Sequence, residues 1–235
     1  MSERTWERIG ALSGLKAAVL FGAAFVIFLT TDPMGTPRVP DIANAADASA
    51  FIGDHQDALK VQLLLNSAAI LAFVWFLGSL WSRLRAAEGG PARVSAIASA
   101  GGIVGAAAVL AGIVFQATAV LLPTGVDVTT LYVLSVMSIG LGGAAFTVFF
   151  LAAGKVILQT RALPVVVGAL ALVAAAASAL GLVSIFVDEG IFNPATGAFG
   201  FWVRFGAFMI WVALASIVLA ATVGRGATRT ARTRR

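Results

Sequence analysis

The sequence predicts an all-α membrane protein with a single domain, residues 1–223, that crosses the bilayer six times. First, 60% of the residues are hydrophobic, against about 45–50% in soluble domains. Second, six apolar segments reach the roughly 20 residues that a transmembrane helix needs, whereas strands of a membrane barrel are about 10 residues long and alternate in polarity. Third, this threading places 13 of the 16 basic residues on one side and 8 of the 11 acidic residues on the other. Since Lys and Arg in short loops set orientation, we expect both termini to be cytoplasmic.

The expected spans follow one another with mostly short connections. Their limits are about residues 12–31, 58–81, 94–122, 129–158, 163–187 and 199–223. The first span resembles a signal peptide, but no small-residue cleavage site follows its apolar run closely, so we expect it to be retained. Gly89-Gly90-Pro91 separates the second span from the third, and Pro164 falls in the first turn of the fifth, where proline is tolerated.

Two segments lie outside the spans. The first outer loop, about residues 32–57, has a second half (41–57) that is rich in Ala and Asp and lacks proline. This half predicts a short helix on the outer membrane surface. Residues 224–235 form a basic tail that we expect to be cytoplasmic and disordered. Its arginines could bind anionic lipids or serve only as a positive anchor; they are Arg225, Arg229, Arg232, Arg234 and Arg235.

The composition excludes several classes of chemistry. Without cysteine there is no disulfide, thiolate nucleophile or zinc–thiolate site. The net charge of +5 does not indicate nucleic-acid binding, because the basic residues lie in short loops without interleaved aromatics. The run Asp54-His55-x-Asp57 has ligand types that suit a divalent metal, but it holds a lone histidine and adjacent ligands point to different helix faces. We therefore expect no metal and no cofactor.

Polar side chains inside the spans concentrate in the outer half, and such groups are the default candidates for function in a membrane. Gln62 and Asn66 are four residues apart and share a helix face, which His55 extends if the helix begins early. Gln116 lies about two turns below the outer end of the third span, and Arg204 roughly 7–8 Å inside the outer end of the sixth. The matching depths predict one outward-facing ligand or ion pocket with these candidates: Arg204, Gln62, Asn66, Gln116, His55 and Asp57.

Arg204 is the most informative of these candidates. A buried guanidinium needs a carboxylate or a ligand anion. The acidic residues at a similar depth are Asp57, Asp127, Asp188 and Glu189. The alternative is that Arg204 extends to the lipid headgroups or makes a purely structural salt bridge.

Small residues recur at a spacing of four, a pattern that lets helices approach closely. The pairs are Gly10 with Gly14, Gly101 with Gly105, and Gly140 with Ala144. They indicate either a dimerisation face or close packing of helices within one chain.

One region resembles a known pattern. Trp75-Phe76-Leu77-Gly78-Ser79-Leu80, the loop Arg83–Gly90 and the following Arg93-Val94-Ser95 resemble small six-span membrane proteins of high-GC, actinobacterial-type bacteria, a family of unknown function. The opening Glu7–Gly14 is similar to the same group. The resemblance implies six helices and a place in the bacterial cytoplasmic membrane. It implies no catalytic or binding residue.

Three classes of function remain open. The first is a non-enzymatic protein that acts by binding, either as an accessory subunit with a protein partner in a membrane assembly or as a receptor for a lipid or small ligand. This class is favoured because it needs no catalytic residues. The second is a small-solute transporter or channel, which would need a line of polar groups that continues to the inner face. The middle of the bundle offers only Ser and Thr for such a line. The third, an enzyme centred on Asp54, His55 and Asp57, lacks an evident nucleophile or oxyanion site.

Overall fold

The computed structural model describes residues 3–30, 47–122, 126–187, 190–195 and 197–232. Within these ranges the chain is helical without β-strands, and six helices are long and apolar enough to cross a membrane. The predicted all-α, six-span membrane fold is confirmed. The six helices are α1 (Glu3–Thr30), α3 (Gln56–Glu88), α4 (Arg93–Leu121), α5 (Val128–Thr160), α6 (Val165–Gly181) and α7 (Val203–Arg232).

Shorter helices complete the described chain. The helix expected between the first two spans is present as α2 (Asp47–Asp54). A 3-10 turn, η2 (Leu182–Ile185), extends α6; a second, η3 (Gly190–Phe192), precedes the π-helical turn η4 (Ala198–Trp202), which leads into α7. The tail that we expected to be disordered from residue 224 is helical as far as Arg232. No proline interrupts it, and its Ala and Arg residues have high helix propensity.

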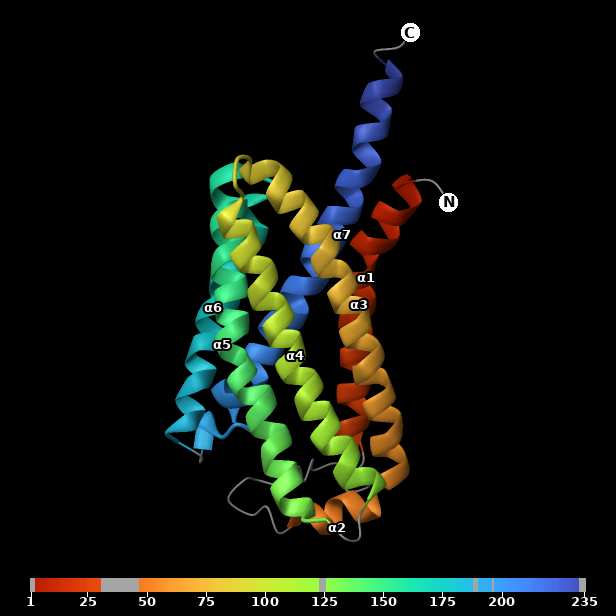
Figure 1. The fold of residues 1–235 in the computed structure, drawn as a ribbon, viewed down its shortest axis with the longest axis vertical. Coiled ribbons are helices and arrows are strands. Elements are labelled where there is room, and N and C mark those ends of the chain that lie inside the picture. The colour runs from red at the N-terminus through yellow and green to blue at the C-terminus, as the bar shows by residue number, and fades with distance from the viewer. Residues whose placement is uncertain (1–2, 31–46, 123–125, 188–189, 196, 233–235) are drawn as a thin grey trace.

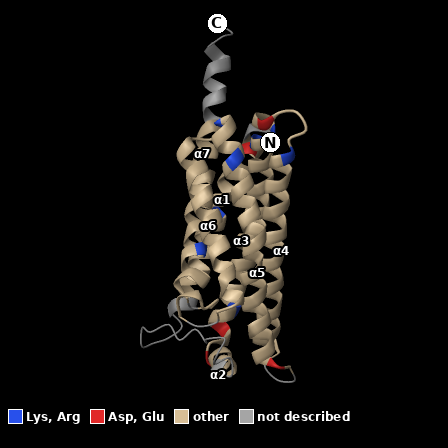
Figure 2. Ribbon diagram, turned by 90° about the vertical axis from the view of Figure 1, so that its left-hand side faces the viewer, with Lys and Arg blue, Asp and Glu red and all other residues tan. Residues whose placement is uncertain are grey.

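The six long helices close into a ring in chain order. Each packs on the next, from α1 to α3, α4, α5, α6 and α7, and α7 returns to α1. Figure 1 shows both termini at one end of the bundle and α2 lying across the other. We name these the termini end and the α2 end. Figure 2 shows most of the charged residues at these two ends, with long uncharged stretches of helix between them.

Side chains cap helices at both ends. At the termini end, Glu88 accepts hydrogen bonds from the backbone N–H groups of Val94 (3.0 Å) and Ser95 (2.7 Å), and so caps α4. At the α2 end, Asp127 accepts a hydrogen bond from the Thr130 hydroxyl and another from the Thr130 backbone N–H (3.2 Å) at the start of α5. These bonds, the one from the hydroxyl first, hold the pKa of Asp127 below its usual value because they stabilise the carboxylate.

Aromatic side chains fill the middle of the ring. We name them the aromatic plug: Phe73 of α3, Phe146 and Phe149 of α5, and Phe208 and Trp211 of α7. The ring centroids of Phe73 and Phe208 are 5.1 Å apart, those of Phe146 and Phe208 also 5.1 Å, and those of Phe149 and Trp211 5.4 Å. These are the spacings of closely packed aromatic pairs. The Trp211 indole N–H donates to a backbone carbonyl of α6 at 2.9 Å, so the plug also holds α6 in place.

The small-residue pairs bring helices of this chain together. A Cβ atom added at Gly101 would lie 2.8 Å from the Phe149 backbone nitrogen, and one at Gly14 would lie 2.6 Å from the Phe76 ring. These neighbours belong to α5 and α3 of the same chain. Close packing within one chain therefore accounts for these glycines, and a dimerisation face is not needed to explain them.

Ser216 of α7 closes the ring against α1. Its hydroxyl donates to the Ala11 carbonyl and accepts from the Leu15 N–H at 2.8 Å. These two backbone groups are four residues apart, the spacing of a donor and acceptor that pair within a helix. The hydroxyl of α7 thus bridges two backbone groups of α1.

Candidate ligand-binding pocket

A cavity of about 190 Å³ lies inside the ring, in the half nearer α2. It is far larger than the about 10–15 Å³ that one water molecule requires. All six long helices contribute to its wall. The polar lining residues are Gln62, Asn66, Gln116, Tyr132, Ser135, Ser178 and Arg204, and the phenylalanines are Phe21, Phe25, Phe146, Phe201, Phe205 and Phe208.

Arg204, in the first turn of α7, is buried in this wall with 8% of its surface exposed. Its Nη1 donates to the Gly140 carbonyl of α5 at 2.9 Å. Among the described residues, the ion pair found is that of Lys60 with Asp57, and none involves Arg204. No fully enclosed side-chain nitrogen or oxygen there lacks a hydrogen-bond partner. The guanidinium has five N–H donors, so its other nitrogens are not fully enclosed, and Arg204 is one of the residues that line the cavity.

Three glycines leave room for the guanidinium between α5 and α6. A Cβ atom added at Gly181 would lie 2.9 Å from the Cδ of Arg204, one at Gly143 would lie 3.4 Å from its Nη1, and one at Gly140 would lie 3.9 Å from its Nη2. Gly140 was expected from its spacing to serve helix packing. In the structure it also supplies the carbonyl that Arg204 contacts.

The amide candidates lie across the cavity on α3 and α4. Gln116 Nε2 donates to Gln62 Oε1 at 3.2 Å, which joins the two helices. Asn66, one turn along α3, lines the cavity and makes no side-chain hydrogen bond to a described residue. The structure thus brings together Arg204, Gln62, Asn66 and Gln116, as their depths predicted. That they bind a ligand stays a prediction.

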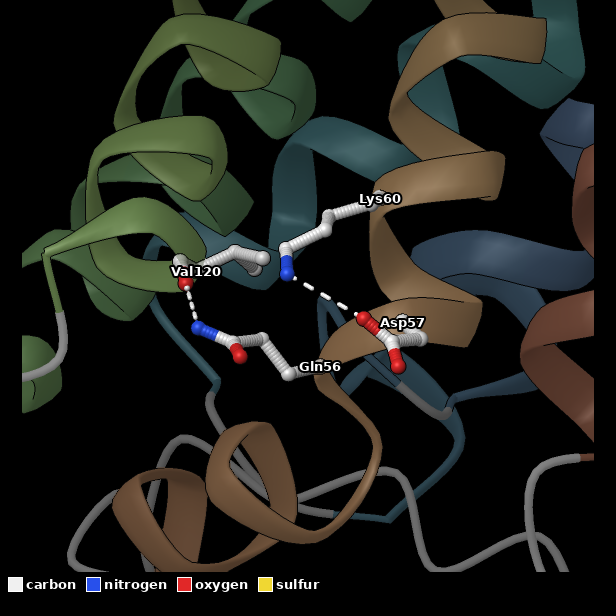
Figure 3. A network of polar contacts seen from close by, with 4 residues as sticks. All are labelled: Gln56, Asp57, Lys60 and Val120. Carbon is white, nitrogen blue, oxygen red and sulfur yellow. Dashed lines mark hydrogen bonds and ion pairs between the residues drawn. The ribbon is translucent and has the colours of Figure 1, made fainter.

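His55 and Asp57 lie outside this cavity, which corrects their inclusion among the candidates. The helix α3 begins at Gln56, so His55 precedes it and does not extend the stripe of Gln62. The His55 ring instead lies 2.9 Å from the Phe51 carbonyl through Nδ1. Asp57 is exposed and pairs with Lys60 at 3.1 Å, beside the hydrogen bond from Gln56 to the Val120 carbonyl (Figure 3).

Of the four carboxylates expected beside Arg204, two make other contacts and two lie outside the residues that the structure describes. Asp57 pairs with Lys60, and Asp127 caps α5. Asp188 and Glu189 fall outside the described residues. An acidic partner for Arg204 is therefore not found in the part of the chain that the structure describes.

The aromatic wall was missed from the sequence, although a signal was present. Phe201, Phe205 and Phe208 follow the spacing of one helix face, and Arg204 lies on the same stripe. An arginine within an aromatic stripe of a span indicates a cavity lined by both. The glycines 143 and 181 had no such signal, because their role depends on which helices become neighbours.

The remaining predicted sites add little to this cavity. Arg225, Arg229 and Arg232 lie on the last turns of α7, and Arg234 and Arg235 lie outside the described residues, so lipid binding by the tail stays a prediction. Among the described residues no group of three His, Cys, Asp or Glu is placed to hold a metal ion.

Comparison with known proteins supplies no assignment. No protein-family model, no curated protein and no solved structure matches the chain. The cavity and the arrangement of charge are therefore the observations on which a function can be based.

Proposed function

We propose that this chain is a multi-pass protein of the bacterial cytoplasmic membrane that binds a lipid or small ligand in the cavity and catalyses no reaction. Both termini are cytoplasmic in this proposal, so the α2 end and the cavity near it face outward. The distribution of basic and acidic residues supports the orientation. The resemblance of the second span and its loop to small bacterial membrane proteins supports the location.

One observation carries the binding function: an arginine and three amide side chains from α3, α4 and α7 converge on a cavity whose lining is mostly apolar. Arg204 lines it with one described hydrogen bond for its five donors, and Asn66 offers an amide without a described protein partner. Burying a charge away from water costs several kcal/mol unless hydrogen bonds and a counter-charge compensate. A bound ligand would provide that compensation.

Transport is the weaker alternative because the cavity does not continue toward the termini end. The aromatic plug fills the middle of the ring directly beneath it. The hydroxyls of Ser67 and Thr147 donate to carbonyls of their own helices, at 2.8 Å each, and so do not form a polar path. A cavity that ends at packed rings favours binding over passage across the bundle.

The test compares wild type with Arg204→Met in a neutral maltoside detergent. We expect a small molecule to co-purify with wild type, as detected by native mass spectrometry, and to be lost from Arg204→Met. Arg83→Met is the matched control, because Arg83 also donates to a carbonyl, that of Ala162 at 3.2 Å, but is exposed. If no molecule is retained and a stoichiometric protein partner co-purifies instead, the chain is an accessory subunit and the ligand-binding proposal is wrong.

Orientation can be tested separately, because the chain has no cysteine. Asp57→Cys and Arg83→Cys each place one thiol at an exposed position, in the first turn and near the last turn of α3 respectively. In intact cells a membrane-impermeant thiol reagent should label the first variant and reach the second only after permeabilisation. The reverse pattern would place the termini outside.

A further inference from the structure

The cavity is rich in donors and positively charged. Its basic lining residue is Arg204, and no carboxylate is among the described residues that line it. Whichever way the two amides are assigned, the bond between Gln62 and Gln116 uses one N–H and leaves a second amide group to donate. Asn66 adds another. A ligand that accepts hydrogen bonds from these donors and balances the charge of Arg204 carries oxygen acceptors and a single negative charge.

Apart from the hydroxyls of Tyr132, Ser135 and Ser178, the rest of the wall is hydrocarbon and aromatic. Phe21 and Phe25 of α1 face Phe205 of α7, with ring centroids 6.4 and 5.2 Å away. Phe201 lies parallel to Phe205 at 5.5 Å. An inorganic anion would lose its hydration against such surfaces without a return, whereas a hydrocarbon chain gains by leaving water. The ligand therefore has an apolar body attached to its charged group.

The plug limits the length of that body. Phe208 and Phe146 line the cavity and are also packed at 5.1 Å from each other within the plug. A chain that extends from Arg204 toward the termini end meets these rings. The cavity inside the ring has a volume of about 190 Å³, which suits one chain of limited length.

We infer that the ligand is a single-chain amphiphile with one oxyanion headgroup, a carboxylate or equivalent, held at Arg204 while its hydrocarbon chain lies among the phenylalanines. This inference rests on the proposed binding function and names the class of ligand for the same site. Gln62, Gln116 and Asn66 supply hydrogen bonds to the second oxygen or to a polar substituent near the headgroup. Gly140, Gly143 and Gly181 leave room for the guanidinium at that end, and the Gly140 carbonyl accepts its hydrogen bond.

The experiment uses the full chain in neutral maltoside and straight-chain carboxylates of increasing length, with alcohols and amines of the same lengths. Thermal shifts and direct titration give the affinities. We expect carboxylates to bind about 10- to 100-fold more tightly than the alcohols, the range that charge-assisted hydrogen bonds provide, and amines not to bind. Arg204→Met should remove this preference, and Arg83→Met should keep it.

Chain length is the second readout. Affinity should rise with length and then stop rising when the chain reaches the plug. Phe208→Ala should move that limit to longer chains, whereas Phe186→Ala, at a ring that is 87% exposed, should leave it unchanged. A limit that is unaffected by Phe208→Ala would overturn the assignment of the chain to the space above the plug.

The other outcomes distinguish a failure of the inferred ligand class from a failure of the proposed binding function. If alcohols bind as tightly as carboxylates in wild type and in Arg204→Met, the charged headgroup is wrong while ligand binding stands. If acetate or inorganic phosphate binds as tightly as the amphiphiles, the hydrocarbon body is wrong. Arg204-dependent co-purification of a two-chain phospholipid would overturn the single chain. If no member of any series binds and nothing co-purifies, the proposed function fails as well.

Discussion

Replacing Arg204 by methionine should have opposite effects on the empty and the occupied protein. The guanidinium is 8% exposed and has one described hydrogen bond, to the Gly140 carbonyl. Burial of an ion costs several kcal/mol, and a hydrogen bond from a charged donor returns about 1.5–3 kcal/mol. Methionine fills similar space without a charge. We therefore expect Arg204→Met to raise the free energy of unfolding of ligand-free protein by about 1–3 kcal/mol.

Adding ligand should change which of the two proteins, wild type or Arg204→Met, has the higher free energy of unfolding. A ligand that binds only the folded state at 100 times its dissociation constant stabilises it by about 2.7 kcal/mol. Wild type should gain this increment and Arg204→Met should not, so the stability advantage of the variant shrinks to nothing or reverses. The sign of the stability difference between Arg204→Met and wild type thus indicates whether the cavity holds a ligand.

Unfolding in maltoside, followed by tryptophan fluorescence as a denaturing detergent is titrated in, measures both states. Bound molecules are first removed by prolonged washing. Arg83→Met is the control and should change stability by less than about 1 kcal/mol with or without ligand, because surface arginines contribute little. The reasoning is refuted if Arg204→Met is the less stable protein when empty, since Arg204 would then be a structural group with a compensating partner.

Other predictions concern the frame around the cavity. Gly101→Ala forces a Cβ atom to 2.8 Å from a backbone nitrogen and should destabilise the fold by about 1–3 kcal/mol, whereas Gly78→Ala, with nothing within 4 Å, should stabilise α3 by about 0.5–1 kcal/mol; equal unfolding curves would contradict this. Ser216→Ala should cost about 1–3 kcal/mol and increase amide exchange in α1, and unchanged exchange would argue against the bridge. Because the pKa of Asp127 is lowered, its contribution is complete above the ordinary carboxyl pKa and is lost as pH falls through the folded-state value. The melting difference between wild type and Asp127→Ala should therefore shrink below about pH 4, and a constant difference would show that the charge is not involved.

The fold was predictable because length and polarity are sufficient to identify spans. Six apolar runs match the six long helices. Their ends were less predictable: α1 begins at Glu3, well before the expected start near residue 12, because a helix continues beyond its apolar part with polar residues. Hydropathy locates the segment suited to hydrocarbon and carries no information on where hydrogen bonding stops.

The site was half predictable for a related reason. Counting residues from the end of a span gives depth, at about 1.5 Å per residue, and depth correctly grouped Arg204, Gln62, Asn66 and Gln116. Which face of a helix points into the cavity depends on the neighbouring helices, and depth alone does not give it. His55 was misplaced because α3 starts one residue after it, and Gly143 was missed because only the α5–α6 contact makes its missing side chain matter.

Arg204 also breaks the pattern that orients the chain. Lys60, another basic residue near the α2 end, is 43% exposed and pairs with Asp57, so its ion pair contributes little to stability. Arg204 has no ion pair with a described residue. The orientation rule, the cost of inserting a charge into hydrocarbon and the cost of burying it in the folded bundle all oppose an arginine at this position. A residue that conflicts with its surroundings at every level points to a functional site. An anion in the cavity would offset the cost of burying the Arg204 charge in the folded bundle. We therefore expect binding of such an anion to raise the stability of the α2 half, and an uncharged side chain at position 204 to remove this coupling.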